Sequence, residues 1–599
     1  MANARGLHAP DKVADYRAKG WWGEETLDGL FADQVRARGD ALAVVDPANR
    51  EALLGSPPRR LTWRELDDEV TALATRLLSL GLGRGDVIGV QLANSVELVE
   101  VYLAAWRLGV VVSPLPVQLR EREVAVMCAR AGATAYLSSA RFGDRTLAAD
   151  AATALGDVES VRAVIAYGPE EETVEVPIGV RVWHPCPATD ADREAVEARA
   201  AADPNEANDA VTICWTSGTE SAPKGVPRCH MDWLAVGVAT TEAPQVTTDD
   251  VLLNPFPMIN MAGISGMFLP WLLTGCVLVQ HHPFDLPTFL GQVAVERATY
   301  TCAPPALLWM LLGNEELMAT VDVSSLTRIG SGSAPLQPAM VRGWQERHGI
   351  SVINFFGSNE GIGLLSSPAD FPDPDDRARF FPRFGAPGVT WSTRAGEWTD
   401  TRLVDIVTGE DVTAPGRPGE LHISGPSVFA GYLHGEDLPS PFDDRGYLRT
   451  GDLFEIAGDR GQYLRYLDRA RDQVIRGGMN IAPAELEGLI ADHPAVADVA
   501  VIGDPDERLG ERVAAVVVLR PGESLTLEEL VAWLRARSIA SFKLPERLEV
   551  RDELPRNPVG KVLKRLLRRP DAPAVREASE GGGAGAHEGG GADVHEAGG

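Results

Sequence analysis

The sequence predicts an α/β fold, in which a large N-terminal domain of layered α/β subdomains precedes a smaller C-terminal α+β domain. Two patterns predict this class. Up to about residue 470, short apolar runs typical of buried strands alternate with amphipathic helical runs, as in layered structures with mainly parallel strands. From there to about residue 569, the order changes to helix, strand, strand and helix. The length of 599 residues suits two or more domains.

The predicted elements of the large domain follow one another in a regular order. The segment 61–82 is an amphipathic helix, with Thr62 as its candidate cap and leucine or valine at helical spacing behind it. Predicted strands at 86–94 and 110–115 flank a second helix over 95–109. Further apolar runs continue the series of strands at 134–139, 161–168 and 211–215.

Composition changes mark the boundaries. The segment 366–383 is rich in Pro and Asp, which predicts a surface loop. The last thirty or so residues are mostly Gly, Ala, Glu and His and offer almost nothing apolar to bury, which predicts disorder. The predicted organisation is an N-terminal extension (1–26), the large domain (27–470), the small domain (471–569) and a disordered tail (570–599).

Bulk properties exclude several classes of function. A formal net charge of −29 argues against a general binder of nucleic acid or of anionic membranes. The N-terminal residues have no apolar signal core, and no apolar run approaches the ~20 residues that a membrane span needs. The six cysteines are scattered without metal-ligand spacing, as in proteins of a reducing compartment. We therefore expect a cytoplasmic protein.

The stretch TSGTESAPKG, residues 216–225, has the inventory of a phosphate-binding loop. Its hydroxyls and backbone N–H groups can bind phosphate oxygens, and Gly218 lets the backbone approach an anion closely. Lys224 adds a positive charge for the outer phosphates. Because this lysine lies between Pro223 and Gly225, the stretch is not the common nucleotide loop. A polar hairpin turn is the alternative for this composition alone.

Other stretches follow in a fixed order along the chain. The glycines of GSGSAPL allow a flat base to lie against the backbone, and a carboxylate such as Asp452 can accept hydrogen bonds from two neighbouring hydroxyls. The stretches are GSGSAPL (330–336), NFFGSNEG (354–361), GYLRTGDLFEI (446–456), RYLDRARDQVIRGGMNIAPAELE (465–487) and PRNPVGKVLKRLLR (555–568). Taken singly, GSGSAPL and Asp452 are more typical of turns, and the basic stretch 555–568 has a solvated helix face as its alternative.

Taken together, these stretches resemble the adenylate-forming superfamily of acyl-CoA synthetases, peptide-synthetase adenylation domains and luciferases. The resemblance covers about residues 27–568. Relatives carry a loop like TSGTTGxPKG, in which Glu220 and Ser221 of this chain replace Thr and Gly. The resemblance implies that the loop holds the pyrophosphate of ATP while an acid attacks the α-phosphate. It also implies a mobile C-terminal domain.

The resemblance implies a binding site for ATP and AMP. Phe356 takes the aromatic position beside adenine, and Asp452 and Arg469 match the residues that hold the ribose hydroxyls. Asn359 replaces a Thr that touches the α-phosphate, so altered binding is expected there. The implied nucleotide-binding residues are Thr216, Ser217, Gly218, Thr219, Lys224, Gly332, Ser333, Ala334, Asn354, Phe355, Phe356, Gly357, Asn359, Asp452, Arg469 and Lys561.

Three of the matching residues are the implied catalytic groups. Glu360 takes the position of the carboxylate linked to Mg²⁺, a cation that prefers oxygen ligands. Lys224 serves the outer phosphates. Lys561, near the start of a predicted basic helix, takes the position of a lysine that reaches the α-phosphate and the carboxylate. The nearby Lys564, Arg565, Arg568 and Arg569 are expected to be solvated.

The resemblance also implies a second half-reaction. Arg471 matches the position about which the small domain turns in relatives, and Gly477 and Gly478 match a loop that lines the thiol tunnel. Coenzyme A is the expected co-substrate. A separate carrier protein is the alternative, and a monomer or homodimer is expected.

The acid site departs from the family pattern. Asn260 stands where relatives have His or an aromatic residue, either because it hydrogen-bonds an unusual acid or through drift in a working site. The implied substrate residues are Asn260, Met261, Gly263 and Ser333. No Asp or Lys is placed to grip an α-amino acid, so a plain aliphatic or aryl carboxylic acid is expected.

The predicted function is the ATP-dependent adenylation of a carboxylic acid to acyl-AMP and pyrophosphate, followed by transfer of the acyl group to coenzyme A. One alternative is a stand-alone adenylating enzyme that passes the acid, or another small oxyacid such as nitrite, to a carrier protein or an amine. The other is a non-catalytic nucleotide-binding homologue, which the two asparagines, Asn260 and Asn359, suggest.

Overall fold

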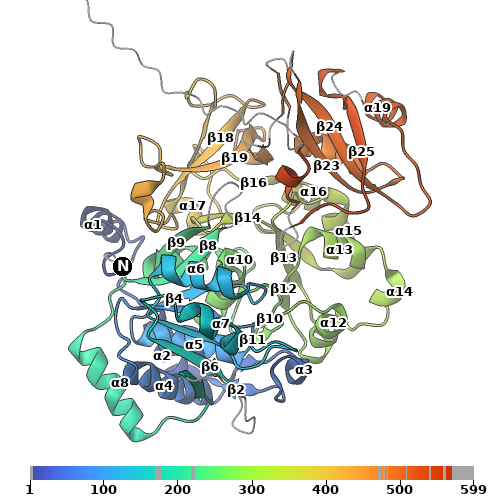
Figure 1. Cartoon of the computed structure of the whole chain (residues 1–599). Coiled ribbons are helices and arrows are strands. Elements are labelled where there is room, and N and C mark those ends of the chain that lie inside the picture. Colours follow the sequence, from blue (N-terminus) through green and yellow to red (C-terminus); the bar gives the residue numbers. More distant parts are fainter. Residues whose placement is uncertain are drawn as a thin grey trace, which may run out of the picture. The chain divides into compact units, whose positions relative to one another are not determined.

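The chain divides into two compact units. The first contains Met1–Arg471, and the second contains Asp472–Asn557 and the chain from Val562 onward. Figure 1 colours them along the sequence, so that the second unit takes the red end of the scale. The computed structural model describes residues 4–168, 179–216, 223–469, 472, 474–476, 479–481, 483–506, 509–537, 541–556 and 562–568.

The first unit contains an eight-stranded sheet that is parallel except at its two ends. In spatial order its strands are β15 (Ile362–Ser366), β14 (Ser351–Ser358), β13 (Arg328–Gly332), β12 (Tyr300–Cys302), β10 (Val251–Asn254), β11 (Val277–Gln280), β1 (Leu42–Val45) and β2 (Arg60–Thr62). The antiparallel pairs are β14 with β15 and β1 with β2.

A seven-stranded sheet of the same kind forms the next layer. In spatial order its strands are β7 (Val180–Trp183), β6 (Ala163–Tyr167), β5 (Ala135–Ser139), β3 (Val87–Gln91), β4 (Val111–Pro114), β8 (Ala210–Thr216) and β9 (Lys224–Cys229). The pair β8–β9 is antiparallel and the others are parallel. The parallel order explains the nearly continuous apolar runs of these strands, because such strands are buried on both faces.

Helices pack against both sheets (Figure 1). The first group is α1 (Pro10–Ala18), α2 (Leu27–Arg38), α3 (Arg50–Leu54), α4 (Trp63–Ser79), α5 (Val96–Arg107), α6 (Glu121–Ala131), α7 (Leu147–Leu155), α8 (Asp190–Ala202) and α9 (His230–Glu242). The second group is α10 (Met261–Gly263), the π-helical turn η1 (Ile264–Phe268), α11 (Leu269–Thr274), α12 (Leu286–Val295), α13 (Pro305–Leu312), α14 (Glu315–Met318), α15 (Pro338–His348), α16 (Pro374–Arg379) and α17 (Ala395–Trp398).

One large core joins the two sheets through the helices between them. Residues of α4, α5 and α11 belong to the same buried cluster as residues of β3 and β10. Trp63 and Trp271 stack in it with ring centres 4.6 Å apart. Burying such large aromatic side chains supplies much of the apolar area that stabilises the unit.

A third sheet of the first unit is entirely antiparallel. In spatial order its strands are β16 (Phe380–Pro382), β20 (Tyr463–Arg469), β19 (Leu448–Ala457), β18 (Pro418–Ser424) and β17 (Asp400–Val404), and a 3₁₀ turn, η2 (Gly435–Asp437), lies between β18 and β19 in sequence. Its core includes Phe381, Phe429 and Phe454.

The second unit is a small α+β structure with its own core, formed by residues such as Val501, Val517 and Leu530. Its sheet contains β22 (Met479–Ile481), β21 (Val474–Arg476), β24 (Gly510–Leu519), β23 (Val496–Asp506) and β25 (Arg547–Val550). Its helical elements are α18 (Pro483–Ala491), α19 (Leu527–Arg535), η4 (Ser541–Lys543) and η5 (Lys564–Leu566). The helix, strand, strand, helix order expected after residue 470 is found in α18, β23, β24 and α19, but the structure also has β21 and β22 before these elements and β25 after them.

Thr62 caps α4 as predicted. Its side chain accepts from the backbone N–H of Glu65, and the Glu65 carboxylate accepts from the N–H of Thr62, so that both residues satisfy donors that a helix end leaves unpaired. Within the described residues, no helix combines the length and the apolar character that crossing a bilayer requires.

The prediction of a surface loop over 366–383 is wrong. This segment contains α16 and β16, and Arg377 in α16 is fully buried. Asp373 caps the helix, and Pro374 suits its first position. The guanidinium of Arg377 donates to the carbonyls of Val352 and Phe371, contacts that composition does not reveal.

The predicted basic helix near Lys561 also differs in the structure. Lys561 lies outside the described residues, and the described part of this segment forms the single 3₁₀ turn η5. Lys564 is not a solvated side chain, because its Nζ lies 2.9 Å from a carboxylate oxygen of Glu487 within the second unit.

Candidate functional site

The predicted phosphate loop joins two antiparallel strands. Thr216 at the end of β8 pairs with Lys224 at the start of β9, so the two residues stand at the base of the loop. The loop residues Ser217, Gly218 and Thr219 lie outside the described residues. Buried Val226 anchors the second strand in the core.

The ammonium group of Lys224 faces a tyrosine that links it to Glu360. Nζ of Lys224 lies 4.9 Å from the centre of the Tyr432 ring, close enough for a cation–π attraction. The hydroxyl of Tyr432 donates to Oε1 of Glu360 at 2.9 Å. Burial, and then the negative charge of Glu360, raise the pKa of Tyr432, so its hydroxyl keeps its proton for this bond. The cation and the carboxylate that the sequence suggested are thus brought together by one aromatic ring.

Asn359 connects the two other parts of the site. Its side-chain oxygen accepts from the backbone N–H of Met261 at 2.9 Å, and its side-chain nitrogen donates to the carbonyl of Trp215 at 3.3 Å. Trp215 directly precedes Thr216 on β8. The amide of Asn359 therefore ties the strand of the phosphate loop to the predicted acid-binding segment, in addition to any contact with a ligand.

Asn260 begins the short helix α10. Its side-chain oxygen accepts from the backbone N–H of Ala262 at 3.1 Å, which makes it the N-terminal cap. At Gly263, a Cβ atom would lie 2.2 Å from the carbonyl oxygen of Pro257. The Pro257 backbone thus passes so close to this helix that a side chain at Gly263 does not fit.

The segment around Gly332 brings two strands very close. A Cβ atom at Gly332 would lie 2.3 Å from the carbonyl oxygen of Phe355, its partner residue across β13 and β14. Ser333 follows in a left-handed conformation, with φ of 65°, and its hydroxyl donates to the carbonyl of Gly332. Ser333 and Ala334 are exposed. This backbone is accessible in the way that a flat ligand requires.

Phe356 on β14 packs against an aromatic cluster of the third sheet. Its ring centre lies 5.0 Å from that of Phe454 and 5.9 Å from that of Tyr466. Two residues earlier on β14, the side chain of Asn354 is buried and donates to the carbonyl of Ala378 in α16. The Asn354 side chain therefore fixes the adjacent helix, while Gly357 is exposed.

The two predicted ribose-binding residues form an ion pair. Asp452 on β19 pairs with Arg469 on β20, and Nε of Arg469 lies 2.8 Å from Oδ1 of Asp452. The carboxylate is almost fully buried, whereas the arginine side chain is about one-third exposed (31%). The predicted hinge residue Arg471 and the predicted catalytic Lys561 lie outside the described residues.

Two residues of this site escaped the sequence analysis. Tyr432 lies 72 residues after its partner Glu360, and Arg228 donates to the carbonyl of Asn359, 131 residues further on. Single aromatic or basic residues at such separations carry no local pattern. The one available signal was the position of Arg228, four residues after Lys224 on the strand that follows the phosphate loop.

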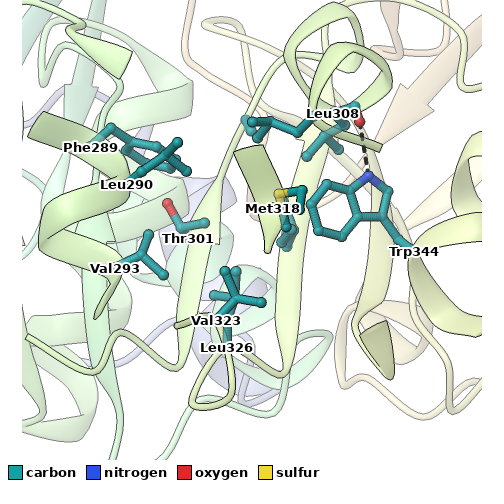
Figure 2. A pocket seen from close by; sticks show the side chains of 12 residues that line it. Phe289, Leu290, Val293, Thr301, Leu308, Met318, Val323, Leu326 and Trp344 are labelled. Atoms are coloured by element: carbon teal, nitrogen blue, oxygen red, sulfur yellow. Dashed lines mark hydrogen bonds between the residues drawn. The ribbon is translucent and has the colours of Figure 1, made fainter. Parts of the chain in front are cut away.

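An apolar cavity elsewhere is not an acid pocket. It measures about 20 Å³, which is room for one water molecule. Figure 2 shows its lining, which includes Phe289, Met318 and Trp344. All its lining side chains lack formal charge, and none of the candidate site residues lines it.

The chain is similar to known proteins over most of its length. Residues 31–433 match the model of the AMP-binding enzyme family, and residues 485–561 match the AMP-binding enzyme C-terminal domain. A medium-chain fatty-acid–CoA ligase of Escherichia coli (strain K12) is 29% identical over 93% of this chain and 92% of its own length. A feruloyl-CoA synthase of an Amycolatopsis species is 30% identical over 85% of this chain and 94% of its own length.

A solved structure supports the same relationship. The crystal structure of ATP-bound MatB from Rhodopseudomonas palustris superimposes with a TM-score of 0.70 at 26% identity. The match covers 91% of this chain and 98% of MatB. Similarity over nearly the whole length of both proteins includes both units of the fold.

Proposed function

The chain belongs to the AMP-binding enzyme family, and from this premise we propose that it joins a carboxylic acid to coenzyme A in an ATP-dependent, AMP-forming reaction. The family match covers both units. The names of the two relatives describe ligation to CoA, one of a fatty acid and the other of a feruloyl group. The proposed substrate class is therefore carboxylic acids, aliphatic or aryl.

The observation that carries the proposal is the grouping around Tyr432. The base of the phosphate loop, the ammonium of Lys224 and the carboxylate of Glu360 meet there in one place. A cation for phosphate oxygens beside a carboxylate for a metal ion suits a triphosphate. Asn359 adds the connection to the segment that we assign to the acid.

In the first step, a carboxylate oxygen of the acid attacks the α-phosphorus of ATP. The bond from this phosphorus to the oxygen that bridges to the β-phosphate breaks, and pyrophosphate leaves. Lys224 and the loop that begins at Thr216 hold the departing phosphates. Lys561 stabilises the charge that develops at the α-phosphate, an effect that acts mainly in the transition state.

Glu360 suits the proposed magnesium ion, because its carboxylate is oriented by the Tyr432 hydroxyl and offers the oxygen ligand that Mg²⁺ prefers. When bound, Mg²⁺ would neutralise charge on the phosphates. Phe356 is assigned to adenine, and the Asp452–Arg469 pair to the ribose. In the second step, the thiol of coenzyme A attacks the acyl carbonyl, and AMP leaves. We assign the change from the first step to the second to a rotation of the chain at Arg471.

The test is a screen for pyrophosphate release across aliphatic, aryl and inorganic acids, each with and without coenzyme A. We expect a carboxylic acid to release pyrophosphate and, with CoA, to yield acyl-CoA detectable by mass spectrometry. Pyrophosphate without acyl-CoA would transfer the proposal to a carrier protein or an amine as acceptor. ATP binding with no release from any acid would instead favour a non-catalytic nucleotide-binding protein.

A further inference from the structure

The first residues of the chain pack behind the candidate site. We call residues 4–26 the N-terminal arm; it precedes the part of the chain that matches the family model, which begins at residue 31. The arm contains α1 and two tryptophans, and its Trp22 belongs to a buried cluster with Cys229 and Met231 at the start of α9. The arm is therefore a packed part of the first unit.

Two buried polar contacts fasten the arm. Nε2 of His8 lies 2.5 Å from Oδ1 of Asp232, and both side chains are essentially inaccessible, at 1% and 0% exposure. The indole N–H of Trp22 donates to the carbonyl of Pro426 at 3.1 Å. A buried polar group without a partner is costly, so each contact fixes the position of what it touches.

Arg228 transmits these contacts to the site. Its side chain is fully buried, and its guanidinium donates to the carbonyls of Asn359 at 2.9 Å, of Ser427 at 2.7 Å and of Asp232 at 3.4 Å. Asn359 is the residue that joins the phosphate strand to the acid segment. One rigid side chain thus connects the residue that the arm contacts, Asp232, with Asn359.

The backbone at Glu360 and Gly361 is held by residues that follow Pro426. The carbonyl of Glu360 accepts from the N–H of Phe429 at 3.0 Å, and the hydroxyl of Ser427 donates to the carbonyl of Gly361 at 2.9 Å. A Cβ atom at Gly361, whose φ is 110°, would lie 1.8 Å from the Ser427 carbonyl oxygen. Displacing this turn, which contains Pro426, would therefore displace Glu360.

Charge links the arm to Arg228. Burial lowers the pKa of Arg228, and the nearby Asp232 carboxylate counteracts this effect. Burial likewise opposes ionisation of Asp232, but His8 and then Arg228 outweigh it and lower the pKa of Asp232. The buried guanidinium thus relies on a carboxylate that His8 of the arm hydrogen-bonds, because an unpaired buried charge is expensive.

We propose that the N-terminal arm is part of the active-site scaffold, in which His8 and Trp22 are positioning residues for Asn359 and Glu360. His8 acts through Asp232 and Arg228, and Trp22 acts through the turn at Pro426. The inference rests on the proposed function, because that function supplies the reaction in which Asn359 and Glu360 take part.

The charges around Asp232 do not suit a metal ion at the same place. Ligand atoms of His8, Cys229 and Asp232 lie within 4.8 Å of one another. However, the guanidinium of Arg228 and the ammonium of Lys12 both interact electrostatically with Asp232. Two cations beside a single carboxylate repel a divalent ion. The Cys229 thiol would also have to lose its proton to bind a metal, and burial raises the pKa of this thiol.

The experiment uses the full chain with His8→Phe, which keeps a ring beside Trp22 but removes the hydrogen bond to Asp232. His8→Gln is the conservative rescue, since its amide N–H can still donate. Arg17→Ala is the matched control on the same arm, because its ion pair with the exposed Glu24 lies at the surface. We measure kcat for pyrophosphate release, the Mg²⁺ concentration at half-maximal rate and, by calorimetry, the Kd of Mg-ATP.

We expect His8→Phe to lower kcat about tenfold and to raise the half-saturating Mg²⁺ concentration several-fold, at a temperature where the variant is folded. His8→Gln should recover most of both losses, and Arg17→Ala should stay within twofold of the original chain. A variant that melts earlier but keeps the original kcat, Mg²⁺ dependence and Kd would overturn the inference.

If His8→Phe does not fold, Trp22→Phe takes its place, because it keeps an aromatic ring in the arm and removes the N–H that donates to Pro426. We expect about a threefold lower kcat for this variant. An unchanged kcat and Mg²⁺ dependence in this variant would likewise overturn the inference. Inactivity of the original chain toward every acid would instead overturn the proposed function, so the two failures are distinct.

Discussion

The hydroxyl of Tyr432 donates a hydrogen bond to the carboxylate of Glu360 across 2.9 Å. The same tyrosine ring lies 4.9 Å from the ammonium of Lys224. One side chain therefore orients a proposed metal ligand with its polar end and attracts a proposed phosphate ligand with its aromatic face. These two functions can be separated by removing the hydroxyl alone.

Tyr432→Phe keeps the ring beside Lys224 and removes the bond to Glu360. A hydrogen bond to a charged group contributes about 1.5 kcal/mol or more, so we expect roughly a tenfold lower kcat/KM for ATP. The half-saturating Mg²⁺ concentration should rise with it. Tyr447→Phe is the control, because it removes a hydroxyl that donates to Asp400. Equal losses of kcat/KM in both variants would show that the hydrogen bond from Tyr432 to Glu360 has no specific effect on the reaction.

Lys561→Ala tests the residue assigned to the transition state. Because removing one preorganised group of this kind typically costs ~10²–10³ in rate, we expect that loss in pyrophosphate release. The Kd of ATP should change little. Lys564→Ala is the control, since this neighbouring lysine is engaged with Glu487. A Lys561 variant with the original rate would refute the assigned role.

Asp452→Asn tests the ribose assignment. An amide has one acceptor oxygen where a carboxylate has two, and without the negative charge it weakens the pair with Arg469. We expect a KM for ATP at least tenfold higher, at a smaller change in kcat. The original chain should prefer ATP over 3′-deoxy-ATP, and the variant should lose most of this preference.

The matched control for Asp452 lies on the same two strands. Glu455 on β19 pairs with Arg465 on β20 at 2.6 Å, so Glu455→Gln weakens an equivalent ion pair at another position. It should keep both the KM and the preference for ATP. Retention of the preference in Asp452→Asn would remove the carboxylate from the ribose site.

The parts of the fold that were predictable are local in sequence. The cap of α4 involves Thr62 and Glu65, three residues apart, and the strands before the phosphate loop are short apolar runs. The motif order predicted Thr216 and Lys224 at one place, and the pairing of β8 with β9 brings them there. Patterns of this kind involve residues within one turn of a helix or within two neighbouring strands.

The parts that were not predictable depend on distant contacts. Arg377 is charged and lies in a segment rich in Asp and Pro, yet carbonyls of β14 and of Phe371 let it be buried in α16. Tyr432 and Arg228 reach the site from positions 72 and 131 residues away from their partners. A polar side chain can be buried where it finds hydrogen-bond partners. When these partners are distant in sequence, only the three-dimensional arrangement reveals them.

The buried His230 predicts how stability depends on pH. Its Nδ1 accepts from the backbone N–H of Leu27 at 2.9 Å, and burial lowers its pKa from the ordinary 6.5 to about 4. Between pH 6.5 and 4, His230 is therefore protonated in the unfolded chain but stays neutral in the folded protein. The free energy of unfolding should fall as the pH drops from 6.5 toward 4, by about 3 kcal/mol in total, and this residue should have no effect above that range.

His230→Asn isolates this contribution. The oxygen of an asparagine side chain can accept from Leu27 without titrating, while the other two buried histidines with a lowered pKa, His281 and His282, remain in both proteins. Urea unfolding at pH 8 should favour the original chain, whose imidazole fills the site. At pH 5 its advantage should shrink by about 2 kcal/mol, because the unfolded state of the original chain alone gains the extra proton. A difference that stays constant between the two pH values would mean that His230 is not held neutral by its surroundings.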